Sequence, residues 1–258
     1  MVLRKLVQSR GDRLIYAALV IISANSGGAF SPIGDVTTIM LWIKGVITTQ
    51  GVITEIFVPS LISMLVPAFI LQYQLNGKFD KSLNLPKADV SQFTKTQRSI
   101  IFWLGVGGLC FVPIFKTITH LPPFMGILLV LGVLWTATEI FHYNTAEDDT
   151  MAKRVTDLLS RIDLSTIMFF LGILMAVAVL QEVGVLTMLG EILDNTFQGN
   201  HYLVTGIIGV LSSIVDNVPL VAGCMGMYPV QAAGDMAVDG VFWQLLAYCA
   251  GVGGSMIS

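Results

Sequence analysis

The chain has 258 residues, of which 54% are hydrophobic and 12% are charged, and its mean hydropathy is +0.78. A soluble domain usually carries charge on about a quarter of its residues, so this composition indicates a protein embedded in a lipid bilayer. The net charge of −3 comes without a clustered basic face, which argues against a nucleic-acid-binding protein.

Four apolar stretches are each predicted to cross the bilayer once, since a spanning helix needs about 20 predominantly apolar residues. These stretches are Ile56–Leu75, Ile100–Phe115, Pro123–Tyr143 and Leu164–Val183. The charged stretches between them, Asn76–Arg98 and Asn144–Asp163, are expected to be loops. The pattern predicts an all-α polytopic membrane protein.

Three further apolar segments do not fit a single uninterrupted crossing. Leu14–Thr48 is too long for one simple span and contains a polar interruption, which predicts a broken helix. Tyr202–Tyr228 is broken by the polar stretch Asp216–Pro219 and is expected to be a re-entrant hairpin. Val241–Ser258 begins another apolar segment that stops short of a full span.

Lysine and arginine are distributed unevenly along the chain. They precede the first span and fill the two charged stretches, and none follows Arg161. Because these residues accumulate on the cytoplasmic side of a membrane, we predict that Asn76–Arg98 is cytoplasmic and Gln231–Gly240 external. Lys44 and Lys116 are exceptions to this pattern. The expected location is the cell's inner (plasma) membrane, as a multi-pass protein.

The first and last broken segments resemble each other and enter the membrane from opposite sides. Ser26–Phe30 aligns with Val252–Met256 around a pair of glycines. A short match in opposite orientation is the pattern of an inverted-topology repeat. Ser258 then corresponds to Pro32, which predicts that the chain is truncated at both ends.

This comparison divides the chain into three parts. Residues 1–75 are predicted to be the remainder of a first repeat, with the broken helix at 14–48. Residues 76–163 are expected to hold the connecting spans and cytoplasmic loops. Residues 164–258 are expected to begin the second inverted repeat, with the hairpin at 202–228 and a truncated broken helix at 241–258.

The interruption of the first broken segment carries the polar groups of a cation site. Asp35 adds a carboxylate, whose placement in a membrane is costly and usually signals function. Helix-breaking residues free backbone carbonyls and amides that hydrocarbon cannot satisfy. The breaking residues expected in both repeats are Gly27, Gly28, Pro32, Gly34, Pro219, Gly253 and Gly254. The neutral oxygen donors of this stretch are Asn25, Ser31, Thr37 and Thr38.

A second polar stretch, Ser212–Pro219, interrupts the predicted hairpin. It would place Asp216 deep in the membrane at the tip of the hairpin, where Pro219 and the preceding polar pair allow a turn. An ordinary exposed loop is the alternative for both polar stretches, although the short apolar flanks of the first one disfavour it. Asp163, before Leu164, is expected to be a helix N-cap, and Glu139 is expected at the membrane interface.

The stretch Asn25–Thr38, which contains Gly-Gly-Ala-Phe-Ser-Pro-Ile-Gly-Asp-Val-Thr-Thr, resembles the motif of NhaD sodium/proton antiporters in the ion transporter superfamily. Ser212–Pro219 is similar to the second-repeat hairpin of that family, and Gly251–Ser258 to the opening of its second broken helix. The resemblance implies electrogenic exchange of sodium or lithium for protons, with Asp35 and Asp216 holding cation and proton alternately. It further implies the oxygen donors Asn25, Ser31, Thr37, Thr38, Ser212, Asn217, Ser255 and Ser258.

Two other functions compete with antiport. An anion carrier of the same superfamily, for arsenite or dicarboxylates, would need neutral or positive groups where Asp35 and Asp216 stand. An intramembrane aspartyl protease is more remote, because Ile33-Gly34-Asp35 holds only half of the Gly-x-Gly-Asp signature. The expected partners are the lipid bilayer, sodium or lithium ions and protons. We expect no enzymatic activity, no nucleic acid, no cofactor and no metal beyond transported sodium; a homodimer is left open.

Overall fold

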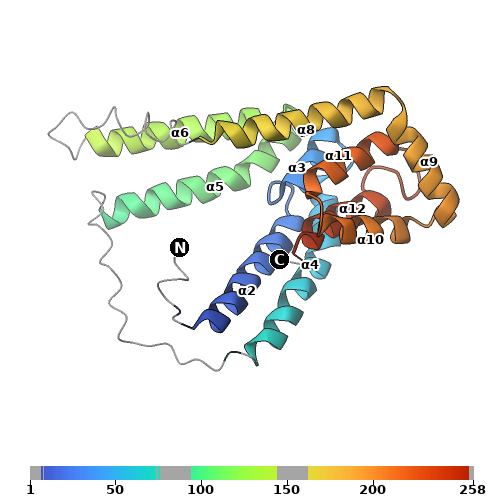
Figure 1. The fold of residues 1–258 in the computed structure, drawn as a ribbon. Coiled ribbons are helices and arrows are strands. Elements are labelled where there is room, and N and C mark those ends of the chain that lie inside the picture. The colour runs from blue at the N-terminus through green and yellow to red at the C-terminus, as the bar shows by residue number, and fades with distance from the viewer. Residues whose placement is uncertain (1–6, 8, 74, 76–93, 144–161, 256–258) are drawn as a thin grey trace. The chain divides into compact units, whose positions relative to one another are not determined.

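The computed structural model describes residues 7, 9–73, 75, 94–143 and 162–255, and the helices among them are shown in Figure 1. These residues form ten helices and no strand. Four of the helices are long and apolar enough to cross a membrane, in agreement with the predicted all-α polytopic class. The chain separates into two compact units, residues 82–168 and residues 1–81 together with 169–258.

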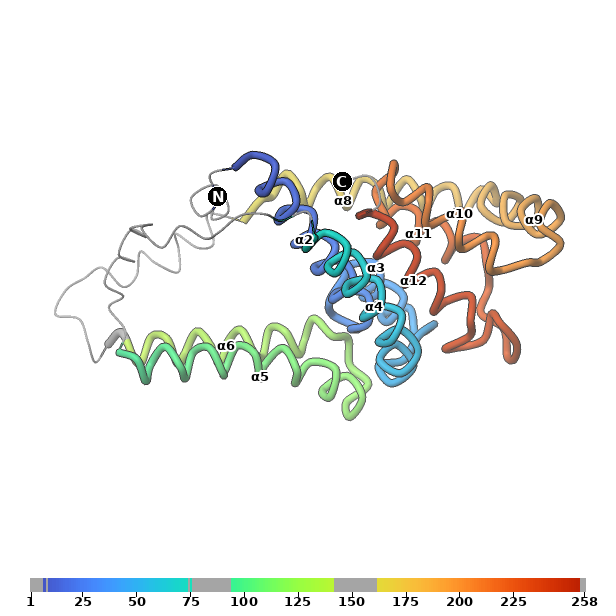
Figure 2. The backbone as a smooth tube through the Cα atoms, turned by 90° about the horizontal axis from the view of Figure 1, so that it is seen from below, coloured from blue at the N-terminus to red at the C-terminus, as the bar shows by residue number. Residues whose placement is uncertain are grey.

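In the unit formed by residues 82–168, two long helices lie side by side (Figure 2). They are α5, Lys95–Thr119, and α6, Pro123–Tyr143. The start of α5 is fixed by a capping box, in which Thr94 and Gln97 each bond the other's backbone N–H. Because Lys95 to Arg98 already belong to α5, the expected loop Asn76–Arg98 ends earlier than predicted.

Helix α8, Leu164–Glu182, begins at the expected N-cap residue, Asp163. The Asp163 carboxylate accepts hydrogen bonds from the backbone N–H of Ser165 (3.1 Å) and of Thr166 (3.3 Å), and from the Thr166 hydroxyl (2.6 Å). These bonds, the hydroxyl first, hold the pKa of Asp163 below its ordinary value. No residue of α8 is buried within the chain, as expected for a helix that faces lipid.

The other unit is built around α12, Val241–Gly253, which contacts α2, α3, α4, α10 and α11. Its helices in chain order are α2 (Arg10–Ala29), α3 (Val36–Lys44), α4 (Thr49–Gln72), α9 (Val185–Phe197), α10 (His201–Ser212) and α11 (Asn217–Met227). Phe242, Trp243 and Leu246 of α12 are fully buried. Beyond them α12 carries Ala247 and Ala250, and such small residues allow neighbouring helices to approach closely.

The predicted interruptions coincide with helix ends. The first broken segment becomes α2 and α3, separated by Phe30–Asp35. The expected hairpin becomes α10 and α11, joined by Ser213–Asp216. With 12 and 11 residues, they are roughly 18 and 16 Å long, well short of a bilayer's hydrocarbon core of about 30 Å.

Helix α9 lies between Val183 and Tyr202, a stretch in which the sequence analysis predicted no helix. Gly184 takes a left-handed backbone conformation (φ 80°), which turns the chain from α8 into α9. One side of α9 packs against α11, and the hydroxyl of Tyr228 donates to Asp194 at 3.1 Å. The acidic residues of α9 therefore belong to an amphipathic helix.

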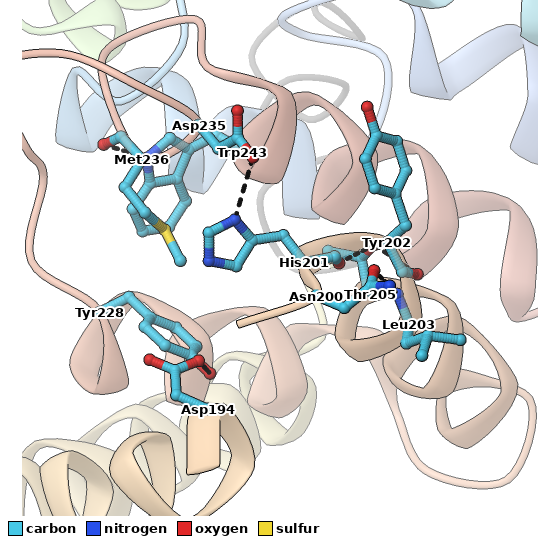
Figure 3. Close-up of polar contacts among 10 residues, drawn as sticks. All are labelled: Asp194, Asn200, His201, Tyr202, Leu203, Thr205, Tyr228, Asp235, Met236 and Trp243. Atoms are coloured by element: carbon cyan, nitrogen blue, oxygen red, sulfur yellow. Dashed lines mark hydrogen bonds and ion pairs between the residues drawn. The ribbon is translucent and has the colours of Figure 1, made fainter. Parts of the chain in front are cut away.

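The connection between α11 and α12, residues 228–240, is held in place by contacts to Asp235 and Met236 (Figure 3). His201, the first residue of α10, lies 3.2 Å from the Asp235 carboxylate. The indole N–H of Trp243 donates to the carbonyl of Met236 at 3.0 Å. These contacts fix the path of the chain into α12 and hence the position of the residues that follow.

Candidate functional site

The break between α2 and α3 is shaped by the close approach of Gly28 and Gly34. Gly28 accepts a hydrogen bond from the N–H of Ser31 (3.2 Å), whose own carbonyl accepts from Gly34 (3.1 Å). A side chain on Gly28 would put its Cβ 2.9 Å from the Gly34 carbonyl oxygen, so only glycine fits there. Pro32 is buried in this turn, whereas Gly27 has open space where a side chain would be.

Asp35 occupies the N-cap position of α3, with an extended backbone (φ −133°, ψ 151°). Its half-buried carboxylate does not bond the N–H groups of its own helix; it accepts a hydrogen bond from the Thr37 hydroxyl. Thr37 and Thr38 are fully buried, and the Thr38 hydroxyl has no hydrogen-bond partner in the described part of the chain. A charged carboxylate at this place is stabilised by the partial positive charge of a helix N-terminus.

The other wall of the site is the glycine-rich end of α12. A Cβ added to Gly251 would lie 3.4 Å from Oδ2 of Asp35 and 3.8 Å from the Thr37 hydroxyl oxygen. A Cβ added to Gly254 would lie 3.8 Å from the amide nitrogen of Asn25. The structure therefore brings the predicted residues Asn25, Asp35 and Thr37 together against α12.

Ser212, the last residue of α10, joins this wall. It is buried, and its hydroxyl donates to the carbonyl of Ala250 at 2.8 Å. Its own carbonyl oxygen lies 3.9 Å from the position of a Cβ on Gly254. Gly253 packs so closely on the backbone of Gly209 in α10 that any side chain there would overlap it.

Asp216 occupies the N-cap position of α11, as Asp35 does for α3. Its carboxylate accepts a hydrogen bond from the N–H of Val218 at 3.1 Å, and its side chain is exposed in this chain. No hydrogen bond or ion pair joins it to Asp35 within the described residues. Pro219 lies in the first turn of α11, where a helix needs no N–H donor.

The remaining predicted residues lie around this site with less defined roles. Ser31 and Asn217 are half-buried, and the Ser255 hydroxyl donates to the carbonyl of Val252 at 2.6 Å. Gly254 follows the end of α12 as its C-cap. Ser258 lies outside the described residues. Each of these roles in ion binding stays a prediction.

Two contributors were missed by sequence reasoning. Gly251 borders Asp35. The sequence pattern that could have indicated it is the run of small residues just before the glycine pair Gly253-Gly254. Ser26, fully enclosed in α2, accepts a hydrogen bond from the Ser63 hydroxyl of α4 at 3.0 Å. That bond ties α4 to the helix that carries Asn25, and nothing local in the sequence indicated it.

The electrostatics of the site favour a small cation. The C-terminal ends of α2 and α12, which carry partial negative charge, lie close to Asp35. No Lys or Arg occurs between Leu14 and Ile43 or after Arg161 to offset the carboxylates. Carboxylate, hydroxyl and carbonyl oxygens are the ligands that hard cations prefer. The described residues contain no group of three His, Cys, Asp or Glu side chains that could hold a metal ion.

Comparisons with known proteins identify the family and the relatives of the chain. The citrate transporter family (CitMHS) matches residues 1–253. Sodium/proton antiporter 1 of Arabidopsis thaliana is 44% identical over 99% of this chain, and sodium/proton antiporter 2 of the same plant is 43% identical over 99% of it. The Na(+)/H(+) antiporter NhaD of Vibrio parahaemolyticus is 29% identical over 93% of the chain. No solved structure gives a significant match.

The resemblance to NhaD antiporters predicted from the motif around Asp35 is confirmed by these relatives. The chain spans 43%, 60% and 59% of the lengths of the three relatives, respectively. The family match, in contrast, extends over nearly the whole chain. Four of the described helices are long and apolar enough to cross a membrane, and the chain belongs to the citrate transporter (CitMHS) family.

Proposed function

We propose that the protein exchanges sodium or lithium for protons across a membrane, with Asp35 as the group that holds either ion. The observation that carries this proposal is the position of the Asp35 carboxylate, in a helix break and against the glycine wall of α12. The names of the relatives from Arabidopsis thaliana and Vibrio parahaemolyticus, which are sodium/proton antiporters, support the same function.

The mechanism is competition for one carboxylate. A proton on Asp35 removes the charge that attracts the cation, and a bound cation favours the charged carboxylate and so releases the proton. Thr37 holds the carboxylate in one orientation through its hydroxyl. Carbonyl groups at the end of α2 offer further oxygens to an ion that has shed water, and the neighbouring Thr38 hydroxyl has no hydrogen-bond partner among the described residues.

Asp216 is proposed as the second carboxylate of the cycle. It occupies the N-cap position of a short helix, as Asp35 does, and its exposed side chain is accessible to ions. Two carboxylates allow more than one proton to be exchanged for each cation, which would make the exchange electrogenic. The transported ions suffice for this chemistry, so we propose a transporter without a cofactor and without enzymatic activity, located in the cell's inner membrane.

The test is sodium-dependent proton movement in everted vesicles from a bacterial host that lacks its own sodium/proton antiporters. Asp35→Asn and Asp216→Asn should each abolish exchange, because asparagine keeps the shape and one oxygen but cannot exchange a proton. Glu139→Gln is the control: Glu139 lies on α6 and accepts a hydrogen bond from Trp135 of the same helix at 3.3 Å. Wild-type exchange in both aspartate variants at every pH would contradict the proposal.

Citrate transport is the second candidate, because the matching family carries that description. A citrate site needs positive groups or neutral donors, and the described site offers two carboxylates and no Lys or Arg. Uptake of labelled citrate into the same vesicles separates the two functions. Citrate uptake that depends on sodium and survives in Asp35→Asn would favour the anion carrier.

A further inference from the structure

A pocket that holds two carboxylates lies between α4 and α12, apart from the site at Asp35. Its volume is about 420 Å³; Glu55, Asp239, Gln244 and Tyr248 contribute polar side chains to a lining that is otherwise apolar. A water molecule occupies about 30 Å³ of liquid, so the pocket has room for an ion with much of its hydration shell. Neither α4 nor the chain after Arg161 contains a Lys or Arg to neutralise it.

One carboxylate of this pocket is fixed by the protein. Asp239 has a left-handed backbone (φ 59°), and its side chain accepts hydrogen bonds from the N–H and the hydroxyl of Thr48, both at 2.6 Å. The amide nitrogen of Gln244 also donates to it, at 3.2 Å. Gly51 makes this approach feasible, because any side chain there would overlap the Asp239 carboxylate.

Two side chains of the pocket have oxygens without hydrogen-bond partners among the described residues. Gln244 is only 6% exposed, and its amide oxygen has no hydrogen-bond partner in the described part of the chain. Since its nitrogen is engaged by Asp239, the oxygen cannot be satisfied by turning the amide over. The exposed carboxylate of Glu55 likewise has no hydrogen bond to a described residue. A buried polar atom without a partner is costly, and a bound cation would satisfy it.

The pocket lies against the side of α12 that, farther along the helix, borders Asp35. Gln244, Tyr248 and Gly251 stand at positions i, i+4 and i+7, which share one face of a helix. Tyr248 donates its hydroxyl to the carbonyl of Pro59 in α4 at 3.3 Å, and Gly251 borders Asp35. Seven residues of helix span roughly 10 Å, so the pocket lies about that far along α12 from the core carboxylate.

We propose that Glu55, Asp239 and the amide oxygen of Gln244 form a second binding site for a monovalent cation, at the external entrance to the Asp35 site. The inference rests on the proposed function for the identity of the ion, and on the charge pattern that places residues 231–240 outside. A fixed negative pocket raises the local concentration of cations, and it does so most at low ionic strength. The site therefore sets the apparent affinity for sodium on the external side alone.

Glu55→Gln should raise the external sodium concentration for half-maximal exchange by about two- to fivefold, the size expected for one exposed charge. The internal half-saturation and the maximal rate should stay unchanged. The matched control is Glu191→Gln, which removes an exposed carboxylate of α9 that does not line the pocket. Comparison of right-side-out and everted vesicles at two ionic strengths measures these values. Equal effects on both sides, or the same effect in Glu191→Gln, would overturn the proposal.

A binding measurement keeps the site testable even if the exchange function fails. Purified Asp35→Asn/Asp216→Asn protein lacks the two carboxylates of the proposed exchange mechanism. Broadening of the 23Na NMR line by this protein should therefore measure sodium binding in the pocket. Adding Glu55→Gln should remove most of the remaining broadening, whereas adding Glu191→Gln should not. Broadening that is absent before Glu55 is changed, or that persists afterwards, would refute the site irrespective of whether the protein exchanges sodium for protons.

Discussion

Gly251→Ala should change the binding of the cation without lowering the stability of the fold. The added methyl group would lie 3.4 Å from Asp35 Oδ2, 3.6 Å from the Ala29 Cβ and 3.8 Å from the Thr37 hydroxyl oxygen, all ordinary contacts. The variant should therefore fold without rearrangement. Alanine is favoured over glycine inside a helix by about 0.8–1.0 kcal/mol, so the free energy of unfolding should stay the same or rise by about 1 kcal/mol.

The same methyl group should weaken sodium binding. Oxygen ligands of hard cations stand about 2.4 Å from the ion, and a carbon 3.4 Å from the carboxylate oxygen leaves no room for an ion between them. Losing one contact to a charged ligand costs about 1.5–3 kcal/mol, which corresponds to a rise of about 10- to 100-fold in the sodium concentration for half-maximal exchange.

The assay pairs two measurements on reconstituted protein: sodium-dependent alkalinisation or acidification in proteoliposomes, and thermal unfolding in detergent. Gly206→Ala is the control, because Gly206 lies in α10 and has no atom within 4 Å of an added Cβ. It should gain the same helix stability without losing sodium affinity. If Gly251→Ala unfolds at the wild-type temperature or above it and keeps the wild-type half-saturation, the cation does not bind between Asp35 and α12.

Three other predictions follow from the same contacts. Gly28→Ala should lower the yield of folded protein sharply, because the backbone across the break cannot move away, whereas its neighbour Gly27→Ala should be tolerated; size-exclusion profiles after extraction distinguish them. In a cysteine-free background, a thiol at Asp235 should react with an impermeant reagent from outside and one at Lys87 only after permeabilisation; equal labelling would contradict the predicted topology. The Asp163 carboxyl should titrate below the ordinary aspartate value, so its capping of α8 is complete above that value and is lost as the pH falls through the lowered pKa; NMR titration at or above the ordinary value would disprove the cap.

The segments that sequence reasoning located well are those with strong local causes. Long apolar runs give spanning helices, and the closely spaced Gly and Pro residues before Asp35 coincide with a helix break, whereas the isolated prolines of α4 and α5 lie inside helices. Helix α9 was missed because its 13 residues mix apolar and acidic side chains and are too short and too polar for a membrane span. An amphipathic period of 3.6 residues was present in that stretch and would have been the better guide.

The candidate site was only partly predictable, because its contacts join residues far apart in the chain. Asn25, Asp35 and Thr37 were predicted from one motif, and the structure places them against α12. The role of Gly251 as the neighbour of Asp35 depends on the packing of α12 against α2, which no local pattern determines. Asp216 shares the helix-capping position of Asp35, yet the structure gives it no contact with that residue.

The contact between Gly209 and Gly253 constrains how the protein can move. The two backbones touch without intervening side chains, and the nearby hydrogen bond from Ser212 to Ala250 joins the same pair of helices. Closely packed surfaces of this kind do not slide past each other gradually. Helices α10 and α12 should therefore move together as one rigid body. Any opening of the proposed ion site toward either face of the membrane must then use a hinge elsewhere.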